Sequence, residues 1–303
     1  MKKVVFAVLI LVLCCTPLLF TACSNVSQRE LLSTSYVCGD DGYELFTYDV
    51  YRLDDAGKYT VKVGEMTMKF ERLNNKDAIL PAVTTESGSV LYAGYVGARL
   101  TTHLEVETGN AANPTDTIDS TVLYKSNCTP SFSYKHTVIG GVDKVMQVIY
   151  EEKYLYATRY ENGVEAASYK HKSSGCYDNE TLYAIIRASV PDESSYSLSY
   201  TSFNPLTGNA DGITISRGSL ENENIPLLTP SVLPEGTETF TTPTYNFTIQ
   251  TDNQYASSYS MELTEGSVTV KNDKIDVTNV KKVITQITEG DYRYVLSGVV
   301  VTR

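Results

Sequence analysis

Apolar and polar residues alternate along most of the chain after residue 42, and this pattern constrains the fold more than any other feature. A period of two places successive side chains on opposite faces of an extended strand, so that one face is buried and the other meets water. Asn162-Gly163 stands between two such runs and predicts a tight hairpin, because both residue types accept a positive φ. The 23 tyrosines, with abundant threonine and valine, suit a pleated, half-buried surface. The sequence therefore predicts a mainly β protein, with strand-like runs at residues 43–53, 59–73, 90–107, 144–161 and 291–301.

Two places interrupt this alternation. Val63 and Met66 are apolar positions three residues apart, which predicts a bulge or bend around Gly64. Residues 222–244 contain four prolines and are predicted to be rich in loops.

Residues 178–188 show helical periodicity instead. Leu182, Ile185 and Ile186 are spaced three and four residues apart, which places them on one side of a helix. Asp178 suits the start of this helix, because its carboxylate can accept hydrogen bonds from the first backbone N–H groups. The segment therefore predicts one short helix among strands.

A helix of this length is unstable alone in water, so another element has to cover its apolar side. We expect Leu182, Ile185 and Ile186 to be buried against the inner face of the sheet. Tyr183 and Arg187 are expected nearer the rim of the sheet.

The first residues are typical of a secretory signal peptide. Lys2 and Lys3 precede an apolar run, residues 4–20, that is short for a membrane-spanning helix. The run leads into Leu19-Phe20-Thr21-Ala22-Cys23, which resembles the lipobox of bacterial lipoproteins, with Phe20 in place of the usual leucine. The resemblance implies cleavage before Cys23 and a diacylglyceryl anchor on its thiol. The alternative is an ordinary signal peptide with an incidental cysteine.

The lipobox resemblance implies a domain order and a location. Residues 1–22 are the signal peptide, residues 23–40 are the lipidated cysteine and a short polar tether, and residues 41–303 form a single β-rich domain. Two acyl chains suffice for stable attachment to a bilayer. We therefore expect the protein in the cell envelope, on the extracytoplasmic face, with the membrane as its partner through the anchor.

The net charge excludes one class of partner. Removing residues 1–22 takes two lysines and no acid from a net charge of −11, which leaves −13. Such a chain repels nucleic acid. The composition identifies no protein partner.

The residues that commonly carry chemistry show no catalytic or metal-binding pattern. Besides Cys23, the mature chain has Cys38, Cys128 and Cys176, without metal-ligand spacing. Cys128 and Cys176 both follow strand-like runs and are predicted to form a disulfide; the alternative is that all three thiols stay reduced. The three histidines stand in no nucleophile-and-base motif. The sequence thus predicts a non-enzymatic protein without a cofactor.

Tyr154 and Tyr156 alternate along one strand-like run, so they share a face. Stacked aromatic rings on that face suit a sugar or an apolar ligand. The alternative is cross-strand packing in a sheet that has no tryptophan.

Four segments between residues 60 and 190 carry a resemblance to a known family. They are Val63-Gly64-Glu65-Met66-Thr67-Met68, SNCTPSFSY at residues 126–134, VIYEEKYLYATRYENG at residues 148–163 and YDNETLYAIIRA at residues 177–188. Together they resemble a family of bacterial extracytoplasmic proteins, domain-of-unknown-function family 3108, which looks related to the lipoprotein-carrier half-barrels. The resemblance implies a strongly curved antiparallel sheet, a half-barrel, wrapped around one short helix.

Two interpretations follow for the function. In the first, the helix fills the concave face incompletely and leaves a cavity for lipid or another apolar, envelope-derived ligand. The second is an adhesion or scaffold module of two β-sandwiches, divided within residues 222–244. A continuous sheet around the helix distinguishes the first from the second. The cavity candidates of the first interpretation are Leu182, Ile185, Ile186, Tyr154 and Tyr156.

Overall fold

The structure is a computed structural model, and it describes residues 42–81, 89–126, 129–173, 175–188, 197–205, 207–225, 240–252, 259–264, 267–271 and 276–302. The predicted signal peptide, the lipidation site Cys23, the tether, Cys38 and Cys128 lie outside the described residues. Among the described helices, none has the length and apolar character needed to span a bilayer.

The first half of the domain is a meander of eight antiparallel strands, each paired with the next in sequence. These strands are β1 (Tyr43–Leu53), β2 (Tyr59–Pro81), β3 (Ser89–Asn110), β4 (Asn113–Lys125), β5 (Pro130–Ile139), β6 (Val142–Tyr150), β7 (Tyr154–Glu161) and β8 (Val164–Lys172).

A short strand, β9 (Cys176–Asp178), and a helix, α3 (Thr181–Ala188), connect this meander to a second one. The second meander returns to β1, because β17 pairs with β1 in antiparallel register. Its strands are β10 (Ser197–Asn204), β11 (Asn209–Ile225), β12 (Phe240–Thr251), β13 (Tyr259–Thr264), β16 (Ile284–Glu289) and β17 (Tyr292–Thr302), and β14 (Ser267–Lys271) and β15 (Asp276–Lys281) form a separate two-stranded sheet.

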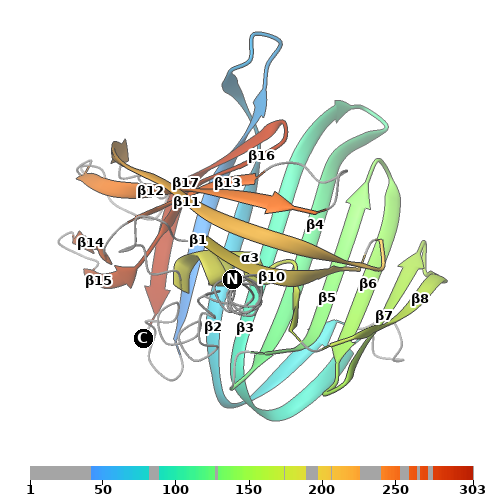
Figure 1. Ribbon diagram of the computed structural model, residues 1–303. Coiled ribbons are helices and arrows are strands. Elements are labelled where there is room, and N and C mark those ends of the chain that lie inside the picture. The colour runs from blue at the N-terminus through green and yellow to red at the C-terminus, as the bar shows by residue number, and fades with distance from the viewer. Residues whose placement is uncertain are drawn as a thin grey trace, which may run out of the picture.

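The two meanders make one 15-stranded sheet that bends almost into a closed barrel. Figure 1 shows β10, β11 and β12 crossing in front of the strands of the first meander, with α3 between the two walls. At one edge of the sheet β9 runs parallel to β10 and contacts β5. Phe203 of β10 packs against Val148 of β6 and Leu155 of β7, which links the walls directly. The mainly β prediction is confirmed, but the sheet is closer to a barrel than to the predicted half-barrel.

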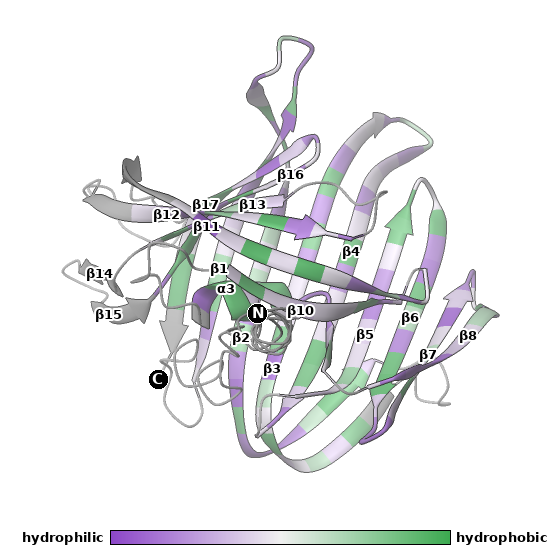
Figure 2. Ribbon diagram, viewed as in Figure 1, coloured by the Kyte–Doolittle hydropathy of each residue, from purple (hydrophilic) through white to green (hydrophobic). Residues whose placement is uncertain are grey.

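The main core lies on the inner face of this sheet, which we define as the face toward α3. One cluster of buried side chains joins Phe46 of β1, Ile215 of β11 and Tyr245 of β12 with Ile185 and Ile186 of the helix. Hydrophobic and hydrophilic residues alternate along the strands in Figure 2, as the period of a strand requires. The predicted burial of Ile185 and Ile186 is therefore observed, with exposed fractions of 3% and 0%.

Two local sequence predictions are confirmed. Val50 pairs with Gly64 but Tyr51 pairs with Lys62, so β2 has a bulge at Val63. Gly64 is required here, because a Cβ atom would lie 2.0 Å from the carbonyl oxygen of Glu105.

The Asn162-Gly163 turn is also confirmed. Asn162 has φ 50° and Gly163 has φ 79°, and the turn connects β7 directly to β8. Two successive positive φ angles are the signature of a type I′ hairpin turn.

Three features differ from the sequence predictions. The helix begins at Thr181, three residues later than predicted, because residues 176–178 join the sheet as β9. Part of the segment predicted as loop is strand, since β11 runs to Ile225 and β12 starts at Phe240. The alternative of two separate β-sandwiches is wrong, because β11 and β12 pair with each other and their side chains enter the same core as those of β1.

The position of Arg187 is a fourth difference from the sequence predictions. Arg187 is 1% exposed and lies in the interior, although the sequence placed it near the rim. Its Nη2 atom donates to Glu44 Oε2 at 2.6 Å, and its Nε atom donates to the carbonyl oxygen of Lys282 at 2.9 Å. The guanidinium group also lies over the rings of Phe46 and Phe70. The ion pair and these contacts compensate the loss of water around the charge.

Replacing Ile186 with alanine tests whether the helix is part of the core. We expect Ile186→Ala to lower the free energy of unfolding by about 2–5 kcal/mol, because the side chain is fully buried. The control is Ile149→Ala, which removes the same atoms from a side chain that is 48% exposed. Surface substitutions usually change stability by about 0.5 kcal/mol or less. Equal urea midpoints for the two variants would contradict the burial of the helix.

Candidate functional site

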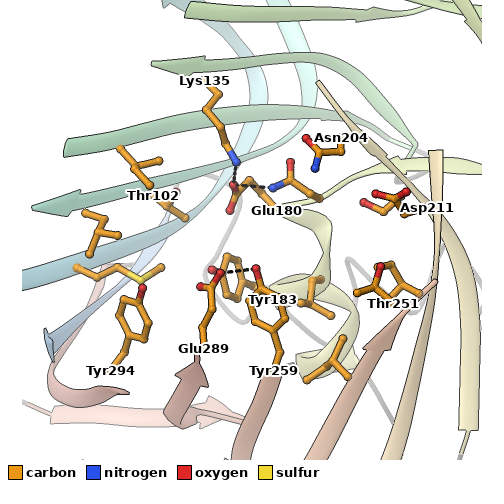
Figure 3. Close-up of a pocket in the computed structure, with 18 of the residues that line it drawn as sticks. Thr102, Lys135, Glu180, Tyr183, Asn204, Asp211, Thr251, Tyr259, Glu289 and Tyr294 are labelled. Atoms are coloured by element: carbon orange, nitrogen blue, oxygen red, sulfur yellow. Dashed lines mark hydrogen bonds and ion pairs between the residues drawn. The ribbon is translucent and has the colours of Figure 1, made fainter. Parts of the chain in front are cut away.

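A pocket of about 220 Å³ lies between the start of α3 and the inner face of the sheet. Both meanders and the helix contribute to its wall (Figure 3). Its apolar lining residues are Met66, Leu104, Ile118, Leu182, Ile213 and Ile249, and its polar ones are Thr102, Lys135, Asn179, Glu180, Tyr183, Tyr200, Ser202, Asn204, Asp211, Thr251, Tyr259, Glu289 and Tyr294.

Strand register explains why one part of this wall is apolar. Met66 of β2 pairs with Leu104 of β3, and Leu104 pairs with Ile118 of β4. Paired residues point to the same face of a sheet, so the three side chains form a continuous row across three strands.

The neighbouring row is polar. Thr102 pairs with Ser120, and Ser120 pairs with Lys135 of β5. The hydroxyl groups of Thr102 and Ser120 are hydrogen-bonded at 2.7 Å. This row therefore places the Lys135 ammonium group on the inner face, beside the apolar row.

Lys135 forms a buried ion pair with Glu180, the residue that precedes α3 (Figure 3). The two residues are 8% and 7% exposed. Burial by itself lowers the pKa of Lys135, but the charges of Glu180 and Asp178 outweigh this effect and raise the pKa above its usual value. Lys135 is therefore charged at neutral pH.

Two further carboxyl groups lie close to this ion pair. Asp178 is fully buried, and its carboxyl group accepts hydrogen bonds from the Tyr150 hydroxyl and from the Glu180 backbone N–H, both at 3.1 Å. Glu289 lines the pocket and accepts a hydrogen bond from the Tyr259 hydroxyl. Burial raises the pKa of both Asp178 and Glu289. Lys135 thus interacts electrostatically with three carboxyl groups, those of Asp178, Glu180 and Glu289.

Four tyrosines line the pocket, and Tyr183, Tyr259 and Tyr294 lie near the carboxyl group of Glu289. Tyr183, Tyr200, Tyr259 and Tyr294 all line the pocket, and burial raises the pKa of each hydroxyl. These hydroxyl groups therefore stay protonated at neutral pH and are able to donate or accept hydrogen bonds. Tyr294 is only 5% exposed, and its hydroxyl has no hydrogen-bond partner among the described residues.

The structure separates the residues predicted to line a cavity. Leu182 lines the pocket, whereas Ile185 and Ile186 lie in the core and not in the pocket wall. Tyr154 and Tyr156 are 39% and 38% exposed, because Leu155 and Ala157 of the same strand take the inward positions. The prediction that these two tyrosines line a common cavity with the helix is therefore wrong for this pocket. On this exposed side, the ammonium group of Lys170 lies over the rings of Tyr154 and Tyr156, at 4.2 and 5.5 Å from their centroids.

The predicted disulfide between Cys128 and Cys176 is not tested by the described residues. Cys176 is buried and its thiol is free, while Cys128 lies outside the described residues. Burial raises the pKa of the Cys176 thiol to about 12, which makes it a poor nucleophile. Thr129, the neighbour of Cys128, lines a second pocket together with Cys176. The pair stays a prediction.

Sequence reasoning missed the polar part of the pocket. Ser133, Lys135 and Thr137 are all buried and share one parity of β5, so this strand turns a polar side inward. The available signal for a polar pocket wall was Lys135, which alternates with the same parity as Ser133 and Thr137. No signal identified Glu289 and Tyr259, because their pairing depends on the register of β13 and β16. Within the described ranges, no group of histidine, cysteine, aspartate and glutamate side chains has the arrangement of a metal site.

Comparisons with known proteins supply no functional assignment. No family model matches the chain, and no curated protein matches it. Among solved structures, a β-barrel-like protein of the domain of unknown function DUF1849 from Brucella abortus is similar, with 10% sequence identity and a TM-score of 0.46. The similarity covers 87% of this chain and 98% of that chain. Such a distant likeness indicates no ligand.

The raised pKa of Glu289 predicts a pH dependence of stability. A carboxyl group whose pKa is higher in the folded state binds more protons when folded. Its stabilising contribution is full below the unfolded pKa, about 4.3 for glutamate, and is lost as the pH rises through the folded pKa. We therefore expect the free energy of unfolding to fall more between pH 4 and pH 8 in the wild type than in Glu289→Gln, whose amide oxygen still accepts from Tyr259.

Urea denaturation at several pH values measures this difference. Glu105→Gln is the control, because the Glu105 side chain is 58% exposed. We expect Glu105→Gln to follow the wild type. Identical pH profiles for all three proteins would show that Glu289 does not titrate differently in the folded state.

Proposed function

We propose that the protein is a non-enzymatic, lipid-anchored protein of the cell envelope that binds a small, partly apolar ligand in the pocket beside α3. The observation that carries the proposal is the row formed by Met66, Leu104 and Ile118, three apolar side chains from adjacent strands that line the pocket beside its polar groups. A concave wall with apolar side chains and a few convergent polar groups is the usual form of a small-molecule site.

The size of the pocket limits the ligand. Sites for drug-sized molecules usually measure about 300–1,000 Å³. At about 220 Å³ the pocket suits a smaller molecule or the end of a longer chain.

The anchor at Cys23 would place the pocket close to the membrane surface. The tether of residues 23–40 is short, so the domain would sit close to the bilayer, where lipids and other envelope molecules are concentrated. The lipobox supports this placement.

Native mass spectrometry of protein purified from its own envelope tests the proposal. We expect the wild type to carry a bound small molecule and to partition into detergent. Cys23→Ser should lose the partitioning, because the acyl chains have no thiol to attach to. Leu104→Trp should lose the bound molecule, because the larger side chain fills the pocket.

Two matched controls accompany these variants. Cys38→Ser also removes one thiol but leaves the lipobox intact, so it should partition like the wild type. Leu91→Trp adds the same ring at a position that is 59% exposed, so it should retain the ligand. Wild-type protein without any bound molecule would contradict the binding function, and unchanged partitioning of Cys23→Ser would contradict the anchor.

A further inference from the structure

We propose that the ligand of this pocket carries a cationic amino group on a short apolar body, as an alkylammonium ion does. The inference rests on the proposed function and specifies the chemical class of the ligand. The inference follows from the charge balance of the pocket, from a tyrosine hydroxyl that has no hydrogen-bond partner among the described residues, and from the position of the apolar row.

The charge balance favours a cation. Asp178, Glu180 and Glu289 lie within the electrostatic influence of Lys135, which is the only lysine or arginine in the described pocket wall. Its ammonium group is already held by Glu180. A cation entering the pocket would offset the remaining carboxylate charge, which costs free energy in a buried setting.

The carboxyl group of Glu289 is the best-placed acceptor for such a cation. Its described hydrogen-bond donor is the neutral Tyr259 hydroxyl, and it has no cation bound directly to it among the described residues. Figure 3 shows Glu289 between Tyr259 and Tyr294, with its carboxyl group pointing into the pocket. A charge-assisted hydrogen bond to this group is stronger than one between neutral partners.

Tyr294 supplies an independent indication of a donor. Its hydroxyl is oriented toward the pocket in Figure 3 and lacks a hydrogen-bond partner among the described residues. Tyr294 is nevertheless buried, with only 5% of its surface exposed. An ammonium group has three N–H donors and no acceptor, so it can satisfy both the Tyr294 oxygen and the Glu289 carboxylate.

The apolar row indicates that the end of the ligand away from the amino group is apolar. Met66, Leu104 and Ile118 lie on the same pocket wall as the polar groups. A short hydrocarbon chain beside these side chains would remove apolar surface from water. An anion such as a carboxylate or a phosphate fits poorly, because it would face Glu180 and Glu289 while Lys135 is held by Glu180.

A series of three probes with the same chain length tests this inference. The probes are n-hexylammonium, n-hexanol and n-hexanoate, titrated calorimetrically into the full chain in phosphatidylcholine nanodiscs, with empty nanodiscs as the blank. We expect n-hexylammonium to bind at least about tenfold more tightly than either of the others, because a hydrogen bond to a charged group is worth a factor of this order.

Two variants assign the effect to the pocket. Glu289→Gln should weaken n-hexylammonium binding by at least about tenfold and leave n-hexanol binding unchanged. Tyr294→Phe should weaken it less, because only a neutral acceptor is lost. Glu105→Gln removes one acid from the exposed surface and should leave all affinities unchanged.

The possible results separate this inference from the proposed function. Equal or tighter binding of n-hexanol or n-hexanoate would overturn the cationic ligand but retain a ligand-binding pocket. No binding of any probe would overturn both. Equal losses in Glu289→Gln and Glu105→Gln would also overturn the inference, because they would show an effect of net charge. If Glu289→Gln does not fold, the order of the three probes on the wild type decides.

Discussion

The buried ion pair between Arg187 and Glu44 determines where the helix lies. Arg187 is in the last turn of α3, Glu44 is in β1, and Lys282, whose carbonyl oxygen also binds Arg187, immediately precedes the last two strands of the sheet. The two side chains are 1% and 0% exposed, so separating them would leave two buried charges without their opposite charge. One guanidinium group therefore holds the helix between the first strand and the closing strands.

The other end of the helix is held by a second set of charges. Glu180 pairs with Lys135 of β5, and Asp178 accepts a hydrogen bond from Tyr150 of β6. An eight-residue helix has little stability of its own, so these contacts and the burial of Ile185 and Ile186 keep it folded. Because the apolar side of the helix is used by the core, its polar start is left facing the pocket. The same contacts that fix the helix thus make the pocket acidic.

Local features of this fold were predictable from the sequence, and contacts between distant residues were not. The strand Tyr43–Leu53 and the Asn162-Gly163 turn follow from alternation and turn chemistry, which are local. The burial of Arg187 was not predictable, because burying a lone charge is costly and its partner Glu44 is 143 residues away. Alternation also leaves open which side of a strand faces the core. On β7 the smaller Leu155 and Ala157 face inward, so Tyr154 and Tyr156 are exposed. The closure of the sheet depends on the pairing of β1 with β17, which no local pattern reveals.

A double-mutant cycle on Arg187 and Glu44 tests most directly whether this ion pair fixes the helix. The cycle compares Arg187→Met, Glu44→Gln and the double variant by urea denaturation at neutral pH. Each single variant should lose about 3–5 kcal/mol of unfolding free energy, because it leaves a buried charge without its opposite charge. The double variant should lose less than the sum of the two, since neither charge remains. Small and strictly additive losses would contradict the account, because they would show that the two side chains do not depend on each other.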